Sequence, residues 1–202
     1  IITTPFTFIA TAEVVSLLGA TPVFVDIDPK TFNIDPDLIE EKINEVYSKT
    51  NLNIKAIIPV NIFGLPCDYD KIKSISNKYN IEIIEDAAQS FGAEYQNQKS
   101  CSLSNLSCTS FFPAKPLGCY GDGGAIFTND SVLNDKLCSI RVHGKGNHKY
   151  DNINIGINGR LDTIQAAILI EKLKIFDDEI EQRQAVAKKY NDYLEDYFDL
   201  QY

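Results

Sequence analysis

Short apolar segments alternate with amphipathic, helix-like segments along almost the whole chain of 202 residues. Strands are predicted over residues 22–26, 54–60, 81–84, 106–112 and 125–128. Helices are predicted over residues 10–18, 35–47, 68–79, 131–142, 161–174 and 177–197. Pro36 is expected just inside the first turn of the second helix, and Ser131 is expected to cap the fourth. Apolar strands that are separated by helices are typical of a mainly parallel sheet with helices on both faces. The sequence therefore predicts an α/β fold, a three-layer α/β/α sandwich.

Charge and cysteine content exclude several classes of protein. A formal net charge of −9 argues against a nucleic-acid-binding surface, which is normally basic. The chain has no apolar run long enough for a membrane span and no signal-peptide pattern. The five cysteines and two histidines lack metal-ligand spacing, and each cysteine is expected to be a small buried apolar residue with a free thiol. We expect a cytoplasmic protein without a metal site and without a nucleic-acid or membrane partner.

Lys115 lies between a predicted strand and a glycine-rich turn, in the stretch Ser110-Phe-Phe-Pro-Ala-Lys-Pro-Leu-Gly118. Apolar neighbours on both sides indicate a poorly solvated amine, and desolvation makes a lysine amine a usable nucleophile. The alternative is an ordinary solvated loop lysine, and the spacing alone leaves both interpretations open.

Asp86 lies just beyond the end of another predicted strand, in Ile83-Ile-Glu-Asp-Ala-Ala-Gln89. In a parallel sheet, ligands bind at the carboxyl ends of the strands, so Asp86 and Lys115 are expected at the same edge. A carboxylate paired with a nucleophilic lysine is the chemistry that pyridoxal phosphate (PLP) requires. Asp86 as a helix N-cap and Gln89 as a polar turn residue are the alternative interpretations.

Three further segments carry weaker signals. Gly121-Asp-Gly-Gly124 is either an anion cradle or a tight turn. His143 is either a base or a structural group at a helix end. Asn158 and Arg160 lie in a glycine-containing segment and are candidate ligands of a phosphate or carboxylate. P-loop and dinucleotide glycine motifs are absent from the sequence, which leaves nucleotide-cofactor binding without its main support.

Seven stretches, in order along the chain, resemble the DegT/StrS-type sugar aminotransferases, which are fold-type I PLP enzymes. The stretches are residues 6–12, 24–28, 85–93, 110–118, 121–125, 141–144 and 156–167. The resemblance implies a PLP-dependent transaminase that moves an amino group from glutamate to a nucleotide-linked keto sugar. It also implies a homodimer with shared active sites.

The resemblance implies a role for each matching cofactor residue. Lys115 resembles the lysine that forms the Schiff base with PLP and moves protons. Asp86 resembles the partner of the pyridine nitrogen, and Gln89 resembles the residue near the ring hydroxyl. Ser110 resembles a phosphate ligand, and Phe8 resembles the aromatic side chain that stacks on the ring.

Two more positions concern the partner subunit and the substrate. Asn158 resembles a phosphate ligand that reaches into the partner's site, and Arg160 matches a position that meets the sugar nucleotide in some members. Residues 108–130 resemble in particular the members that aminate UDP-2-acetamido-2-deoxy-3-oxo-glucuronate for O-antigen sugars. The alternatives are a 4-keto sugar as substrate, a non-catalytic regulator with a PLP fold, and an unrelated dinucleotide-binding protein. Lysine at position 115, where some members have histidine and act as dehydratases, favours transamination.

The domain organisation follows from the same resemblance. Residues 1–176 match the PLP-binding large domain without its amino-terminal segment, and residues 177–202 match the start of a long helix that leads to a small carboxy-terminal domain. The chain contains no methionine and begins within a predicted strand or its exit loop, so we expect it to be a fragment of a longer protein.

Overall fold

A computed structural model describes residues 1–148, 150–198 and 200 of the chain. Six strands form the main sheet in the order β2-β1-β3-β4-β7-β8. They are β1 (Ile2–Thr3), β2 (Val23–Phe24), β3 (Ala56–Ile57), β4 (Glu82–Asp86), β7 (Leu106–Ser110) and β8 (Gly124–Phe127). Neighbouring strands are parallel except β7 and β8, which pair antiparallel. The predicted mainly parallel sheet is thus confirmed.

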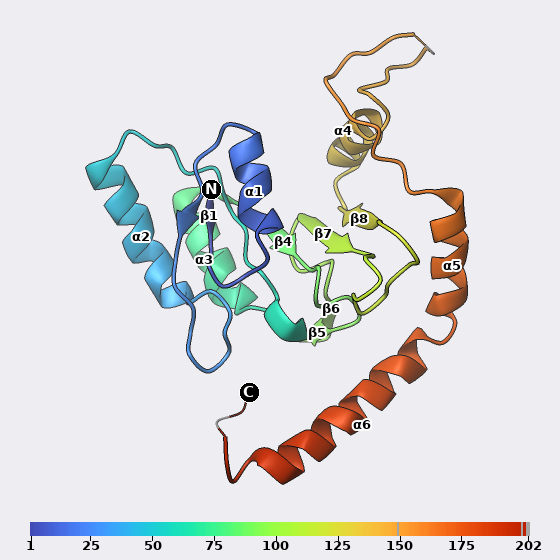
Figure 1. Ribbon diagram of the computed structural model, residues 1–202. Helices are drawn as coiled ribbons and strands as arrows, with labels where there is room; N and C mark the ends of the chain where they lie inside the picture. Colours follow the sequence, from blue (N-terminus) through green and yellow to red (C-terminus); the bar gives the residue numbers. More distant parts are fainter. Residues whose placement is uncertain (149, 199, 201–202) are drawn as a thin grey trace.

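The helices fall close to the predicted segments. They are α1 (Ala10–Leu17), α2 (Pro36–Lys49), α3 (Tyr69–Tyr79), α4 (Ser131–Ile140), α5 (Thr163–Leu173) and α6 (Phe176–Leu194), with a short 3₁₀ helix η1 (Ile62–Gly64). Figure 1 shows α2 and α3 beside the sheet on one side of the molecule. Helices α5 and α6 follow one another on the opposite side of the molecule. The helical layers predicted around the sheet are therefore present.

The alternation of side chains in β4 separates the two faces of the sheet. Ile83 belongs to the main apolar core, together with Ile39 and Ile43 of α2 and Ile72 of α3. Asp86 points to the other face, where it contacts α1. Ile39, Ile43 and Ile72 are fully buried, and burial of one such side chain stabilises the fold by about 1.5–3 kcal/mol. The core therefore fixes one face of β4 and leaves the face of Asp86 for other contacts.

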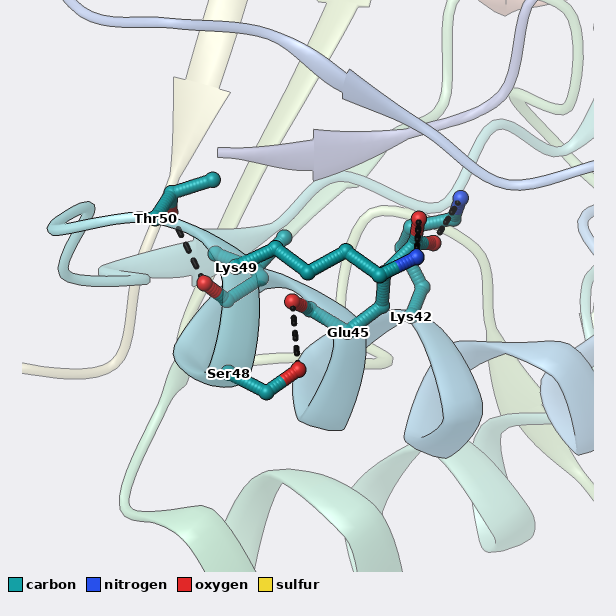
Figure 2. Close-up of polar contacts among 6 residues, drawn as sticks. Lys42, Glu45, Ser48, Lys49 and Thr50 are labelled. Atoms are coloured by element: carbon teal, nitrogen blue, oxygen red, sulfur yellow. Dashed lines mark hydrogen bonds and ion pairs between the residues drawn. The ribbon is translucent and has the colours of Figure 1, made fainter.

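Helix α2 is capped at its N-terminus, carries charged residues on its outer face and buries isoleucines on its inner face. Its N-cap Asp35 accepts a hydrogen bond from the Asp37 amide, and Pro36 occupies the first turn, as predicted. On the solvent side, Glu45 pairs with Lys42 at 2.6 Å and with Lys49 at 3.2 Å (Figure 2). Hydrogen bonds from Lys42 and then Lys49 hold the pKa of Glu45 below its usual range. Pairs at this spacing support a helix only weakly, so buried isoleucines on the inner face hold α2 in place.

Several predicted details are wrong. The predicted cap Ser131 is the first residue of α4, and Asp130 caps that helix by accepting the amides of Val132 and Leu133. Helix α6 ends at Leu194 and not near Tyr197, and Cys138 is exposed and not buried. The antiparallel hairpin β5 (Glu94–Tyr95) and β6 (Gln98–Lys99) was not predicted.

Within the described part of the chain, no helix combines the length and the apolar character that a bilayer crossing requires.

Candidate active site

The carboxyl ends of β1, β4 and β7 bring the predicted cofactor residues to one edge of the sheet. Asp86 is the last residue of β4 and pairs with Cys108 of the parallel strand β7, whose last residue is Ser110. Strand β1 leads into the segment that carries Phe8 and begins α1. The expected location of the site at the carboxyl edge agrees with this arrangement.

Asp86 is held by two hydrogen bonds, one to each carboxylate oxygen. Its Oδ2 accepts from the Thr11 hydroxyl of α1 at 2.8 Å, and its Oδ1 accepts from the Ala88 amide at 3.1 Å. The side chain is half-buried. A turn and not a helix follows Asp86, so the helix N-cap interpretation is wrong. Each oxygen of a carboxylate can accept more than one hydrogen bond, so the fixed carboxylate still has capacity for a cationic N–H.

Lys115 lies in a compact turn between β7 and β8. Its amide donates a hydrogen bond to the Phe112 carbonyl at 2.8 Å, and the Cys119 amide donates one to the Phe111 carbonyl at 2.8 Å. The side chain is half-buried, less enclosed than a fully desolvated lysine. Within the described residues, no hydrogen bond or ion pair is recorded for its amino group. The amino group is therefore available to contact a ligand.

Helices α5 and α6 hold this turn from outside. Lys172 of α5 donates to the Gly118 carbonyl at 2.6 Å, and Gln165 accepts the Tyr120 amide at 2.8 Å. Leu117 is 2% exposed in a second apolar cluster that contains Phe176 of α6. The position of Lys115 thus depends on packing by the last two helices of the chain.

Replacing Gly118 with alanine is expected to disrupt the turn. A Cβ atom at this position would lie 2.5 Å from the Pro113 carbonyl oxygen and 2.8 Å from that of Phe112. Both are backbone atoms that cannot rotate away, so we expect a loss of about 1–3 kcal/mol in the free energy of unfolding, measured by urea denaturation. Gly159→Ala is the control, because the nearest atom is an Ile157 side-chain atom at 3.3 Å. Equal stability of the two variants would contradict the prediction.

The other predicted cofactor residues occupy positions around the same edge. Ser110 is half-buried, and its Oγ accepts the Phe112 amide at 3.2 Å, which leaves its hydroxyl proton for another acceptor. Gln89 is half-buried in the turn after Asp86. Phe8 is 72% exposed directly before α1, so its ring is accessible to a planar ligand.

Asn158 and Arg160 lie apart from this cluster. Both are exposed in the connection between α4 and α5, where the Arg160 Nε donates to the Asn158 Oδ1 at 3.1 Å. Figure 1 shows that this connection extends away from the sheet. Asn158 also forms an isolated bridge with Val142. Within the described residues, neither side chain has a recorded bond to the residues at the carboxyl edge.

The glycine-rich turn and His143 have structural roles in the chain. A Cβ at Gly124 would lie 2.8 Å from the Thr109 carbonyl oxygen, so this glycine permits close strand pairing. His143 has a positive φ of 57° after the end of α4, and its amide donates to the Ile157 carbonyl. These observations favour the tight-turn and structural interpretations.

Sequence reasoning missed Thr11 and Glu85. Thr11 contacts a residue 75 positions away, and only the presence of a second threonine four residues earlier, Thr7, hinted at a shared role. Glu85 is fully buried on the core face of β4, opposite Asp86. A charged residue inside a buried strand was the available signal, since such a residue is almost never buried without partners.

Cys108 provides a pH-dependent reporter beside Asp86. Burial raises the pKa of its thiol to about 11, and the negative charges of Asp86 and Glu85 act in the same direction. The thiolate is the reactive form, so alkylation by iodoacetamide is expected to be roughly 100-fold slower at pH 8 than for a free cysteine and to rise towards pH 11. Asp86→Asn removes a raising charge and is expected to speed labelling. The Cys138→Ser background removes the exposed thiol. Fast labelling of Cys108 at pH 8 would contradict the prediction.

The residues at this edge fit PLP. The fixed carboxylate of Asp86 suits a protonated pyridine nitrogen, and the unpaired amine of Lys115 suits an aldehyde. The hydroxyl of Ser110 and the exposed ring of Phe8 suit a phosphate and an aromatic ring face.

A sequence profile of the DegT/DnrJ/EryC1/StrS aminotransferase family matches residues 1–201. A Pseudomonas aeruginosa protein named UDP-2-acetamido-2-deoxy-3-oxo-D-glucuronate aminotransferase is 56% identical over 191 residues, 95% of this chain and 51% of that protein. A Geobacillus stearothermophilus protein named pleiotropic regulatory protein is 47% identical over 196 residues, 97% of this chain and 50% of that protein.

The fold is also similar to solved structures. The crystal structure of a DegT DnrJ EryC1 StrS aminotransferase from Brucella abortus matches with a TM-score of 0.95 and 52% identity. The match covers 96% of this chain and 52% of that chain. The chain therefore spans about half the length of the proteins that it matches.

Proposed function

Because the chain belongs to the DegT/DnrJ/EryC1/StrS aminotransferase family, we propose that it forms the PLP-binding part of a nucleotide-sugar transaminase. The observation that carries this proposal is a fixed Asp86 carboxylate at the carboxyl end of β4, next to the strand β7 whose following turn carries the unbonded amine of Lys115. The enzyme would take an amino group from glutamate and give it to a keto sugar.

The proposed roles follow from the chemistry of each side chain. PLP supplies an electron sink that stabilises negative charge on the carbon next to the transferred nitrogen. Lys115 binds the cofactor aldehyde and carries the proton to and from the reacting carbon. Asp86 holds the proton on the pyridine nitrogen, and Phe8 orients the ring by stacking.

Two further residues complete the proposed cofactor site. Ser110 donates a hydrogen bond to the phosphate, and Gln89 donates to the ring hydroxyl. Asn158, exposed on the extended α4–α5 connection, reaches the phosphate in the partner subunit of a homodimer. A second subunit would explain why Asn158 lies apart from the cluster within one chain.

The proposed substrate is UDP-2-acetamido-2-deoxy-3-oxo-glucuronate, a precursor of surface polysaccharides such as O-antigen, and the proposed compartment is the cytoplasm. The name of the Pseudomonas aeruginosa relative, which is 56% identical to this chain, supports this substrate. The exposed guanidinium of Arg160 suits the uronate carboxylate, because arginine and carboxylate form charge-assisted pairs.

Two rival functions are compatible with the same fold. A 4-keto nucleotide sugar would need the same cofactor residues and a different sugar pocket. A non-catalytic regulator is favoured by the name of the Geobacillus stearothermophilus relative. Retention of both Lys115 and Asp86 supports catalysis over regulation, since a binding protein has no need of a reactive amine.

The proposed domain division follows the packing of the last helix. Residues 1–176 form the large domain, and residues 177–202 begin the helix that leads to a small domain. Phe176, the first residue of α6, is 5% exposed and belongs to the same apolar cluster as Leu117 of the turn that carries Lys115. Val186 and Tyr190, further along α6, are 52% and 64% exposed. The apolar residues of the later turns are thus left for another part of the protein.

The test begins with the visible spectrum of the purified chain mixed with PLP, followed by borohydride reduction and peptide mapping. A cofactor band with the reduced adduct on Lys115 supports the proposal. The full-length protein is then given glutamate and either the 3-keto uronate or a 4-keto nucleotide sugar. Amination of the 4-keto sugar alone would favour the first rival, and bound PLP without turnover of either sugar would favour the second. A folded full-length protein that binds no PLP would refute the proposed function.

A further inference from the structure

Thr11 connects two of the proposed cofactor residues. Its hydroxyl donates to the Asp86 Oδ2 at 2.8 Å, and its amide donates to the Phe8 carbonyl at 3.3 Å. One residue in the first turn of α1 thus bonds to the carboxylate at the end of β4 and to the backbone of the exposed aromatic residue.

The carboxylate of Asp86 determines which hydroxyl group donates in each of these hydrogen bonds. An ionised carboxylate only accepts hydrogen bonds, so the Thr11 proton points to Asp86. The Thr7 hydroxyl lies 3.1 Å from that of Thr11 and is therefore the donor in that pair. The resulting relay runs from Thr7 through Thr11 to Asp86, and Thr11 is 7% exposed. Water competes poorly at such a site, which strengthens the charge-assisted bond.

We propose that Thr11 is a positioning residue that holds the Asp86 carboxylate and the Phe8 segment in one fixed geometry for the PLP ring. This inference rests on the proposed function. The hydroxyl leaves Asp86 in a single orientation and withdraws part of its negative charge, so it sets both where the pyridine proton is held and how tightly. The hydrogen bond from the Thr11 amide to the Phe8 carbonyl keeps the segment that carries the stacking ring in place beside that carboxylate.

The residue type at position 11 suits this role. Valine has the same shape and the same branching at Cβ, so Thr11→Val removes the hydroxyl bond with little change in helix preference. Thr11→Ser keeps the hydroxyl and loses only the methyl group. Ser16→Ala removes another hydroxyl from α1, one whose recorded bond is to the Ala12 carbonyl of its own helix.

The first measurement tests the contact in the cofactor-free chain by urea unfolding. A double-mutant cycle of Thr11→Val with Asp86→Ala is expected to show coupling of at least about tenfold in the unfolding equilibrium constant, equivalent to ~1.4 kcal/mol. The cycle of Ser16→Ala with Asp86→Ala is expected to be additive. If Asp86→Ala does not fold, Asp86→Asn takes its place. An additive Thr11 cycle would overturn the contact.

The second measurement tests the role with PLP. Thr11→Val is expected to weaken PLP binding about tenfold or more and to shift the pH midpoint of the bound-cofactor absorbance, because a charge-assisted bond is lost. Thr11→Ser is expected to restore both, and Ser16→Ala to match the wild type. Coupling in the first measurement with unchanged PLP affinity and absorbance would overturn the positioning role. If the wild-type protein itself binds no PLP, the proposed function fails, and the role of Thr11 fails with it.

Discussion

Transamination is expected to fall by roughly 10³- to 10⁴-fold when Lys115 is replaced with alanine, the upper range for loss of a positioned acid–base group. The amine of Lys115 has no recorded partner in the described residues, so its removal leaves no ion pair broken. The loss should therefore lie in the chemical step and not in the stability of the fold. The measurement is the single-turnover reaction of the PLP-loaded protein with glutamate.

The control for this prediction is another lysine outside the site. Lys136 is exposed on α4, and Lys136→Ala is expected to retain wild-type rates and unfolding free energy. Lys115→Arg adds a second comparison, because it keeps the positive charge and cannot form the covalent bond to an aldehyde. Wild-type activity in Lys115→Ala, with borohydride trapping of PLP on a different lysine, would show that Lys115 has been assigned the wrong role.

The sequence was sufficient to predict a mainly parallel sheet and to place Asp86 near the carboxyl end of one of its strands. Buried strands and amphipathic helices leave periodic patterns, so β4, β7 and the helices near them were found close to their observed positions. The direction of β8 was not readable, because a short apolar strand has the same pattern in parallel and antiparallel pairs. The β5–β6 hairpin is polar, and its turn uses positive φ values at Gln96 and Asn97, which no glycine marked.

The candidate site was predictable residue by residue only where a local motif existed. Lys115 and Asp86 stand out because Asp86 ends one strand of the sheet and Lys115 follows another. Thr11 did not stand out, since its bond to Asp86 joins segments that are 75 residues apart. The observed cap Asp130 is the neighbour of the predicted cap Ser131, and either side chain can cap a helix, so the prediction was wrong by one position.

Replacement of Glu85 with alanine is expected to reduce the free energy of unfolding by about 3–5 kcal/mol, the range for breaking a buried charged network. Glu85 is fully buried and accepts five hydrogen bonds, from the Asn61 amide group, the Ser100 and Ser107 hydroxyls, and the Cys101 and Leu103 backbone amides. Removal of the carboxylate leaves all five donors without this acceptor in the interior. Because native domains are stable by only about 5–15 kcal/mol, this is a large fraction of the total.

The network also explains why this loss would reach the candidate active site. Asn61 follows β3, residues 100–103 precede β7, and Ser107 lies within β7, so Glu85 joins three segments to β4 on the core face of the sheet. Asp86 is the next residue in the chain and points to the opposite face. A shift of β4 after loss of Glu85 would therefore move Asp86 as well, although Glu85 itself has no place in the proposed chemistry.

Urea denaturation can test the prediction even if Glu85→Ala does not fold. Ser107→Ala removes one donor, at 2.6 Å from the Glu85 Oε2, and is expected to cost about 1–3 kcal/mol, the range for a hydrogen bond to a charged group. Glu82→Ala, at an exposed position of the same strand, is expected to change stability by less than about 0.5 kcal/mol. A loss below about 1 kcal/mol in a folded Glu85→Ala protein, or equal effects of Ser107→Ala and Glu82→Ala, would show that the buried carboxylate does not organise this edge of the sheet.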